Sequence, residues 1–190
     1  MMDKERMIET IRSGMPERRW LHVQGVIETS IVLARRFGAD PAKAELAAIL
    51  HDLAKYWPVD RMEAYIREEG VDLDVLGYDK ELWHAPAGAY AAAKDFGVTD
   101  AEVLDAVRWH TSGRESMTLL DRVVCLADYM EPSREFPGVD RIRELAQTDL
   151  DGALTAGFDS TIRFLLDKGK RIYPLTVTAR NGLIRNTTTT

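Results

Sequence analysis

Four histidines and two aspartates have the types and the order to do chemistry together: His22, His51, Asp52, His84, His110 and Asp128. Imidazole nitrogens and carboxylate oxygens bind divalent transition metals, and six of them exceed what one ion usually takes from a protein. The pattern therefore suggests two metals that share one site. Two metals activate water and polarise a phosphoryl group without a nucleophilic side chain, which is typical of a metal-dependent phosphohydrolase.

The His51-Asp52 pair follows an apolar run, residues 46–50, on a helix that we expect to be buried. A buried imidazole beside a buried carboxylate is costly unless both are paired. Adjacent residues of a helix point about 100° apart, so we expect these two side chains to reach metal at the helix end rather than each other. Asp128 lies in another apolar run and needs a cation, with a salt bridge to a buried arginine as the alternative. The alternative for His22 is a core histidine satisfied by a hydrogen bond.

Three basic side chains near the predicted ligands are candidates for contact with phosphate, namely Arg19, Lys55 and Arg134. A guanidinium grips a phosphate with two donors, and a lysine acts as a point charge. Thr111 offers a hydroxyl, and Gly113 allows the backbone to approach a phosphate closely. Simpler alternatives stay open: Lys55 complements a helix dipole, Arg134 pairs with a neighbouring glutamate, and the Thr111 and Gly113 segment is a helix cap and turn.

The elements that position these residues are helices, because apolar residues recur at three- and four-residue spacing and strand alternation is almost absent. Asp40 and Pro41 predict a helix start, and Gly38 and Gly70 predict helix ends. The predicted helical ranges are 3–12, 16–37, 42–54, 58–69, 81–96, 100–109, 118–130, 140–146, 150–167 and 176–185. We predict one all-α domain over residues 1–186 and a disordered tail over residues 187–190.

Bulk composition restricts the class of protein. The chain has 190 residues, 45% of them hydrophobic, and a net charge of −6. This acidity disfavours a nucleic-acid partner, but a small anionic substrate is compatible with it because bound metal supplies positive charge. The one cysteine, Cys125, lies in an apolar run and is predicted to be a buried core residue. No apolar stretch approaches the about 20 residues of a membrane span, and the charged start is unlike a signal peptide, which predicts a cytoplasmic protein.

Several short strings around these residues also resemble a known family when read in order. They are Arg19-Trp20-Leu21-His22, Leu50-His51-Asp52-Leu53-Ala54-Lys55, Trp83-His84-Ala85, His110-Thr111-Ser112-Gly113 and Ala127-Asp128-Tyr129-Met130-Glu131-Pro132-Ser133-Arg134. They resemble the YqeK branch of the HD-domain superfamily over residues 19–181, with Trp83 where leucine is common in that branch.

The resemblance implies an HD-domain helical bundle that hydrolyses diadenosine tetraphosphate symmetrically to two ADP. It implies a two-iron centre, although manganese, cobalt or zinc would also suit the donors. The implied metal ligands are His22, His51, Asp52, His84, His110 and Asp128, with Asp52 bridging the ions. Asp52 and Lys55 are the predicted catalytic residues. Arg19, Lys55, His84, Thr111, Gly113 and Arg134 are the predicted substrate contacts.

Other functions stay open at this point. One is an HD phosphohydrolase of another nucleotide, such as a deoxynucleoside phosphate or a guanosine polyphosphate. A cyclic-dinucleotide enzyme is disfavoured because its usual His-Asp-Gly-Tyr-Pro signature is missing. A metal module that binds nucleotide without turnover and a plain helical scaffold are further alternatives. The apolar segment 162–166 is a candidate surface for a homodimer.

Overall fold

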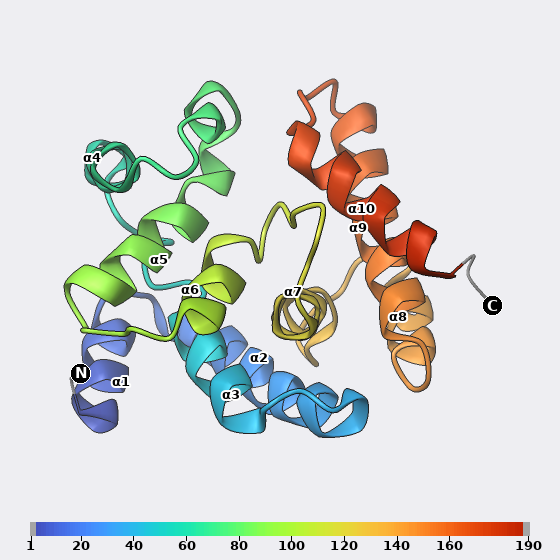
Figure 1. Ribbon diagram of the computed structural model, residues 1–190, viewed down its shortest axis with the longest axis horizontal. Coiled ribbons are helices and arrows are strands. Elements are labelled where there is room, and N and C mark those ends of the chain that lie inside the picture. The colour runs from blue at the N-terminus through green and yellow to red at the C-terminus, as the bar shows by residue number, and fades with distance from the viewer. Residues whose placement is uncertain (1–2, 188–190) are drawn as a thin grey trace.

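The computed structural model describes residues 3–187 and contains helices, without strands, across that range (Figure 1). The α-helices are α1 (Lys4–Ser13), α2 (Glu17–Phe37), α3 (Pro41–Leu50), α4 (Val59–Glu69), α5 (His84–Lys94), α6 (Ala101–Arg108), α7 (Leu119–Met130), α8 (Val139–Leu145), α9 (Leu150–Asp167) and α10 (Pro174–Thr187). Two short 3-10 helices, η1 (Asp74–Gly77) and η2 (Lys80–Leu82), lie between α4 and α5. The prediction of an all-α fold is confirmed.

The helix ends follow from local chemistry that the sequence already displays. The Asp40 side chain accepts hydrogen bonds from the first backbone N–H groups of α3, and Asp100 does the same for α6. Thr118 and Asp121 form a reciprocal capping box at the start of α7. Gly38 ends α2 with a φ of 84°, a left-handed conformation that a residue with a Cβ rarely adopts.

The core lies where α2 packs along α3 and α7, with α6 against α3 and α7. Its small side chains on α3, Ala44, Ala47 and Ala48, are fully buried and let neighbouring helices approach closely. Cys125 lies in this core on α7 and is fully buried, as predicted. Burial also raises the pKa of the Cys125 thiol, so the thiol stays protonated and unreactive.

The predicted helix 42–54 is too long at its C-terminal end, because α3 ends at Leu50. Beyond it, the backbone N–H groups of Leu53 and Lys55 bond to carbonyls three residues earlier, at 3.0 Å in each case. These tight turns replace the wider α-helical geometry and re-aim the side chains between them. The predicted start of the helix 81–96 is also wrong. Helix α5 begins at His84, because the preceding residues form η2 with Asp79 as its cap.

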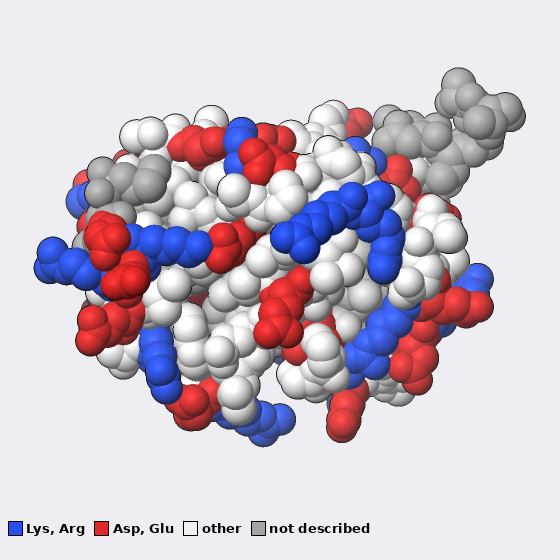
Figure 2. Space-filling view, turned by 90° about the horizontal axis from the view of Figure 1, so that it is seen from below, with Lys and Arg blue, Asp and Glu red and all other residues white. Residues whose placement is uncertain are grey.

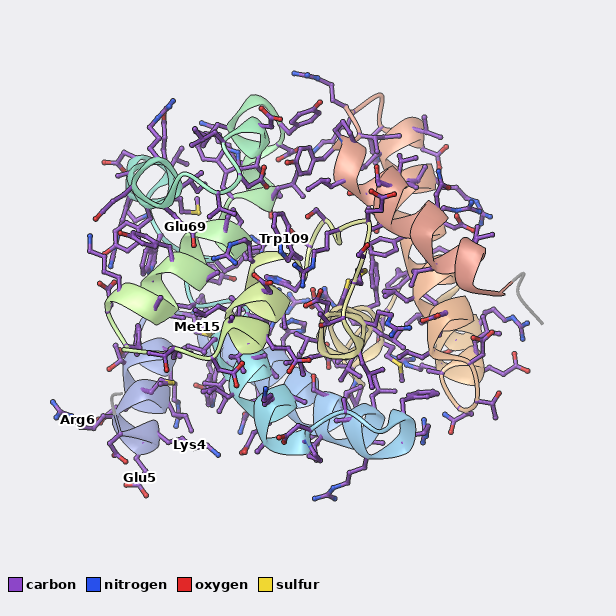
Figure 3. The ribbon with its side chains drawn as sticks, in the orientation of Figure 1. Lys4, Glu5, Arg6, Met15, Glu69 and Trp109 are labelled. Carbon is purple, nitrogen blue, oxygen red and sulfur yellow. The ribbon has the colours of Figure 1, made fainter. Side chains whose placement is uncertain are left out.

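The C-terminal helices α8, α9 and α10 form the side opposite α4 and α5, on the right of Figure 1. Side chains of the segment between α4 and α5 and of the α9–α10 turn join the two sides. The Tyr173 hydroxyl donates to Asp72 at 2.6 Å, and Lys170 Nζ donates to Asp79 at 2.8 Å. We call these two pairs the mouth bridge, because they join the two sides of the molecule where a cleft lies between them. Figure 3 shows side chains from both sides reaching into the space between the ribbons.

Helix α10 includes Thr187, which the sequence placed in a tail, and residues 188–190 lie outside the described range. Among the described residues, none of the helices is both long enough and apolar enough to cross a membrane. The face seen from below carries interspersed basic and acidic side chains (Figure 2).

Candidate metal centre

The predicted ligands meet in the interior, at the ends of four helices and the middle of one. Two groups of three have ligand atoms within 4.8 Å of one another: His22 with His51 and Asp52, and His84 with His110 and Asp52. We call these the His22 group and the His84 group. All five residues are buried. The two groups share Asp52, which is the arrangement expected of a carboxylate that bridges two ions.

The two oxygens of Asp52 face different groups. Oδ2 lies 3.2 Å from His51 Nε2 and 3.7 Å from His22 Nε2, whereas Oδ1 lies 3.3 Å from His84 Nε2. His84 Nε2 lies 3.1 Å from His110 Nε2. His51 and Asp52 were expected to reach a metal rather than to pair with each other, and they approach to 3.2 Å without a hydrogen bond at His51 Nε2.

In three of the four histidines, a hydrogen bond at the Nδ1 atom sets the tautomer of the ring. Nδ1 of His51, His84 and His110 lies 2.6–2.7 Å from the backbone carbonyl three residues earlier. A carbonyl only accepts, so Nδ1 carries the proton and Nε2 presents its lone pair to the centre. These carbonyls lie at helix ends, where the last carbonyls lack helical N–H partners. Burial together with the neighbouring His84 and His51 lowers the pKa of His110 to about 3, which keeps this ligand neutral.

Buried atoms without a partner show that the donor set fits metal ions. Among the described residues, His22 Nε2, His51 Nε2 and Asp52 Oδ1 are buried without any hydrogen bond. In addition, His22 Nε2 lies 3.0 Å from Asp128 Oδ1. Buried acceptors that face one another are costly, and a cation between them removes that cost. The chemistry of the donors, imidazole and carboxylate, suits divalent transition metals.

The predicted ligands His84, His110 and Asp128 line a cleft of about 990 Å³. The predicted substrate contacts Arg19, Lys55 and Thr111 line the same cleft, as does Arg134. The opposite wall comes from α9 and the α9–α10 turn and includes Phe164, Lys170, Arg171 and Tyr173. Sequence reasoning did not assign this wall, because its residues carry no motif and join the cleft only through the packing of α9.

Each of the predicted basic contacts has a carboxylate partner. Arg19 pairs with Asp52, and Lys55 Nζ lies 2.8 Å from Glu81. Arg134 pairs with the Asp128 carboxylate and also donates from Nε to the Asp128 backbone carbonyl at 2.7 Å. The alternative that Arg134 pairs with a neighbouring glutamate is therefore wrong. Burial raises the pKa of Asp128, but the Arg134 charge, together with the His22 hydrogen bond and the His51 charge, outweighs it and holds that pKa well below its usual range.

Comparison with known families agrees with this geometry. A model described as the HD domain matches residues 19–133, a span that includes both ligand groups and Asp128. The chain belongs to the HD-domain family. This family is metal-dependent, and the two ligand groups give the protein the side chains to hold metal ions.

This HD-domain protein is also similar to named proteins over nearly its whole length. Proteins named symmetrical bis(5'-nucleosyl)-tetraphosphatase from Bacillus subtilis and Halalkalibacterium halodurans are 46% and 45% identical to it over 183 residues. Each alignment covers 96% of this chain and 98% of the relative. The crystal structure of a predicted HD superfamily hydrolase involved in NAD metabolism from Clostridium acetobutylicum has a TM-score of 0.93 and 37% identity. It covers 98% of this chain and 99% of that one.

Gly113 was predicted to let the backbone approach a phosphate, but in this HD-domain structure it lies in a turn. Its φ is 65°, and its N–H bonds to the Trp109 carbonyl at 2.8 Å, which makes it a turn residue. A Cβ there would lie 2.6 Å from Ala179 Cβ and 2.7 Å from Phe158. The glycine is therefore explained by the turn and by packing, and the residues that line the cleft do not include it.

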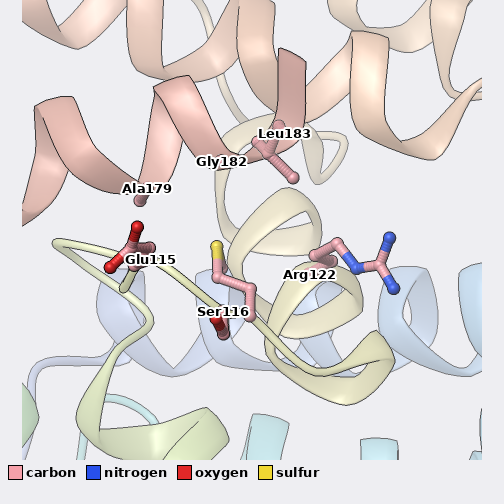
Figure 4. A pocket seen from close by; sticks show the side chains of 7 residues that line it. Glu115, Ser116, Arg122, Ala179, Gly182 and Leu183 are labelled. Atoms are coloured by element: carbon pink, nitrogen blue, oxygen red, sulfur yellow. The ribbon is translucent and has the colours of Figure 1, made fainter. Parts of the chain in front are cut away.

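A smaller pocket of about 350 Å³ lies between the loop before α7 and helix α10 (Figure 4). It is lined by Glu115, Ser116, Met117, Arg122, Ala179, Gly182 and Leu183. It contains none of the predicted metal ligands.

One residue of the HD-domain centre, Glu131, was not predicted from the sequence to belong to the site. Glu131, which is 1% exposed, accepts a hydrogen bond from His22 Nδ1 at 2.9 Å. The feature of the sequence that could have indicated this role is the position of Glu131, one turn after Asp128 at the end of α7.

Proposed function

We propose that this HD-domain protein hydrolyses diadenosine tetraphosphate, and related dinucleoside polyphosphates, symmetrically to two ADP. The observation that carries the proposal is the sharing of Asp52 by two ligand groups at a basic cleft. The names of the Bacillus subtilis and Halalkalibacterium halodurans relatives support this choice of substrate.

In this proposal the His22 group, together with Asp128, would hold one ion and the His84 group would hold the other, with Asp52 common to both groups. Iron is the proposed native metal, and manganese, cobalt or zinc would fit the same nitrogen and oxygen donors. When bound, two such ions supply Lewis acidity, which activates water and neutralises charge on phosphoryl oxygens.

The protein's own residues then bind and orient the substrate. Arg19, Lys55 and Arg134 lie at the centre and line the cleft, so their charges oppose those of the polyphosphate. Water adds to one of the two central phosphorus atoms, and the bond from that phosphorus to the bridging oxygen breaks. The departing ADP takes that oxygen, and the two protons of the water pass to the product phosphates or to solvent.

Symmetrical cleavage requires a nucleoside diphosphate on each side of the reacting bond. The residues that line the cleft come from η2 and the α9–α10 turn, and also from the start of α8 and the middle of α9. Each of these two sets offers basic and aromatic residues, with Arg171 and Tyr173 at the turn and Arg141 and Phe136 near the start of α8. This supports a central position for the metals along an extended substrate.

The test is to purify the protein anaerobically, count its metals, and separate the products of diadenosine tetraphosphate by chromatography. Two metals per chain and ADP as the sole product are expected. AMP together with ATP would contradict symmetrical cleavage. Deoxyadenosine monophosphate and a guanosine polyphosphate are the comparison substrates, and faster hydrolysis of either would favour a different nucleotidase. Binding without turnover would indicate a sensor.

We further propose a single domain over residues 1–186 that acts in the cytoplasm as a homodimer, without a nucleic-acid partner. The exposed Leu166 on α9, at 62% and outside the residues that line the cleft, supports α9 as the contact surface. Sedimentation of the wild-type protein and of Leu166→Glu tests the assembly.

A further inference from the structure

We propose that Glu131, with Ser133 and Gly25, is a positioning device that fixes the ring of His22 and strengthens metal binding in the His22 group alone. The inference rests on the proposed two-ion centre, and it assigns a role to residues outside the ligand set.

His22 differs from the other three histidine ligands in the partner of its Nδ1 atom. His51, His84 and His110 use a backbone carbonyl at a helix end or turn. His22 lies inside α2, where the backbone carbonyls are engaged by helical N–H groups. Its Nδ1 therefore needs an acceptor from elsewhere, and Glu131 Oε1 provides it at 2.9 Å from a position 109 residues later in the chain.

The Glu131 carboxylate is itself held in place. The Ser133 backbone N–H donates to Oε2 at 2.8 Å, and the Ser133 hydroxyl donates to Oε1. Arg143 donates to the backbone carbonyl of Glu131 at 3.0 Å and to that of Met130 at 3.1 Å, which fixes the end of α7. The carboxylate is 1% exposed, so water does not compete for these bonds.

Gly25 gives the carboxylate room. It lies three residues after His22 on α2, and a Cβ there would overlap Glu131 Oε2 and lie 3.2 Å from Cδ. A glycine inside a helix costs about 1 kcal/mol relative to alanine. Its presence in the middle of α2 is explained by the close approach of Glu131.

The consequence for the metal centre follows from this geometry. A carboxylate on Nδ1 fixes the Nδ1–H tautomer, aims Nε2 toward Asp128 Oδ1 at 3.0 Å, and increases the electron density of the ring. Loss of such a partner typically weakens metal binding by about 10–100-fold. The His84 group keeps its backbone partners and should be unaffected.

The experiment uses the full chain, stripped of metal and titrated with Zn²⁺ in competition with a coloured chelator. Glu131→Ala and Gly25→Ala should each weaken one of the two Zn²⁺ sites by about 10–100-fold and leave the other unchanged. Glu131→Gln keeps a hydrogen-bond acceptor but not the charge, so it should lose less Zn²⁺ affinity than Glu131→Ala. Because both residues act through one carboxylate, Gly25→Ala should add nothing in the Glu131→Ala background.

A second measurement does not depend on metal or activity. Nitrogen-15 NMR of the metal-free chain should show His22 with its proton on Nδ1, and Glu131→Ala should remove that preference for His22 alone. Gly88→Ala is the matched glycine control, because a Cβ there meets only ordinary contacts at 3.8 Å or more. Glu63→Gln controls for loss of an exposed carboxylate that pairs with Arg67. Circular dichroism checks the fold of every variant.

Wild-type affinity at both sites in Glu131→Ala and Gly25→Ala would overturn the inference, as would equal weakening of both sites or additive effects in the double variant. The outcome is separate from the proposed function. A fully loaded wild-type protein that leaves diadenosine tetraphosphate intact would remove the proposed substrate, whereas the titration and the NMR spectrum decide the role of Glu131.

Discussion

The metal centre and the mouth bridge lie in the same cleft but satisfy their polar atoms in opposite ways. At the centre, His22 Nε2, His51 Nε2 and Asp52 Oδ1 are buried and make no hydrogen bond within the described protein. At the mouth bridge, Lys170 has Asp79 and Tyr173 has Asp72, and the lysine side chain is 47% exposed. Buried polar atoms without a hydrogen bond indicate a site built for something that the protein binds, whereas a partly exposed ion pair such as Lys170 with Asp79 contributes little to stability.

Asp52→Ala should have the largest effect, because Asp52 is the only residue common to both ligand groups. We expect a loss of turnover of at least about 1000-fold and the loss of at least one metal. Metal analysis and product chromatography measure these, with the exposed Asp60→Ala as the control. Full metal content with normal turnover would remove the bridging role from Asp52.

Metal removal should be the next largest effect. Ions that bind the folded chain alone stabilise it by about 2.7 kcal/mol at a free concentration one hundred times their dissociation constant. Chelation should therefore lower the melting temperature and abolish turnover while the helical circular dichroism signal remains at 25 °C, since the apolar core packs without the centre. An unchanged melting temperature would contradict the interpretation of the unpartnered atoms.

Lys55→Ala should act on the substrate rather than on the metals. Its ammonium lines the cleft and bonds to Glu81, outside the ligand groups. Loss of one charged contact with phosphate is expected to cost about 1.5 kcal/mol, or roughly a tenfold rise in KM. Metal analysis should be unchanged, and Lys168→Ala, on the exposed turn after α9, is the control. Loss of metal would make the lysine a structural residue.

The mouth bridge should give the smallest effect. Lys170 lowers the pKa of Asp79, so the pair stabilises the folded protein above the ordinary pKa of an aspartate. That contribution is lost as the pH falls through the lowered pKa, because protonation removes the charge. Asp79→Asn should reduce the free energy of unfolding at pH 7 by less than about 1 kcal/mol, and the difference from wild type should vanish in acid. Denaturant titrations at pH 7 and below pH 3 measure it.

Helix type and most helix starts could be predicted because they depend on neighbours in the chain. Asp40, Asp100 and Thr118 cap helices through residues two or three positions away. The end of α3 could not be predicted in this way. An apolar, alanine-rich sequence favours a longer helix, and the turns after Leu50 are set instead by the packed surroundings of the centre.

Residue type decides which atoms can bind metal, so the order of His22, His51, Asp52, His84 and His110 along the chain was enough to predict a metal centre. How these atoms face one another depends on the packing of the helices. The tertiary structure divided them into two groups around Asp52, brought Glu131 to His22 across 109 residues, and used α9 to form the far wall of the cleft. It also assigned Gly113 to packing rather than to phosphate. The physical reason is that ligand type is a property of one side chain, whereas a distance between helices depends on how the whole core packs.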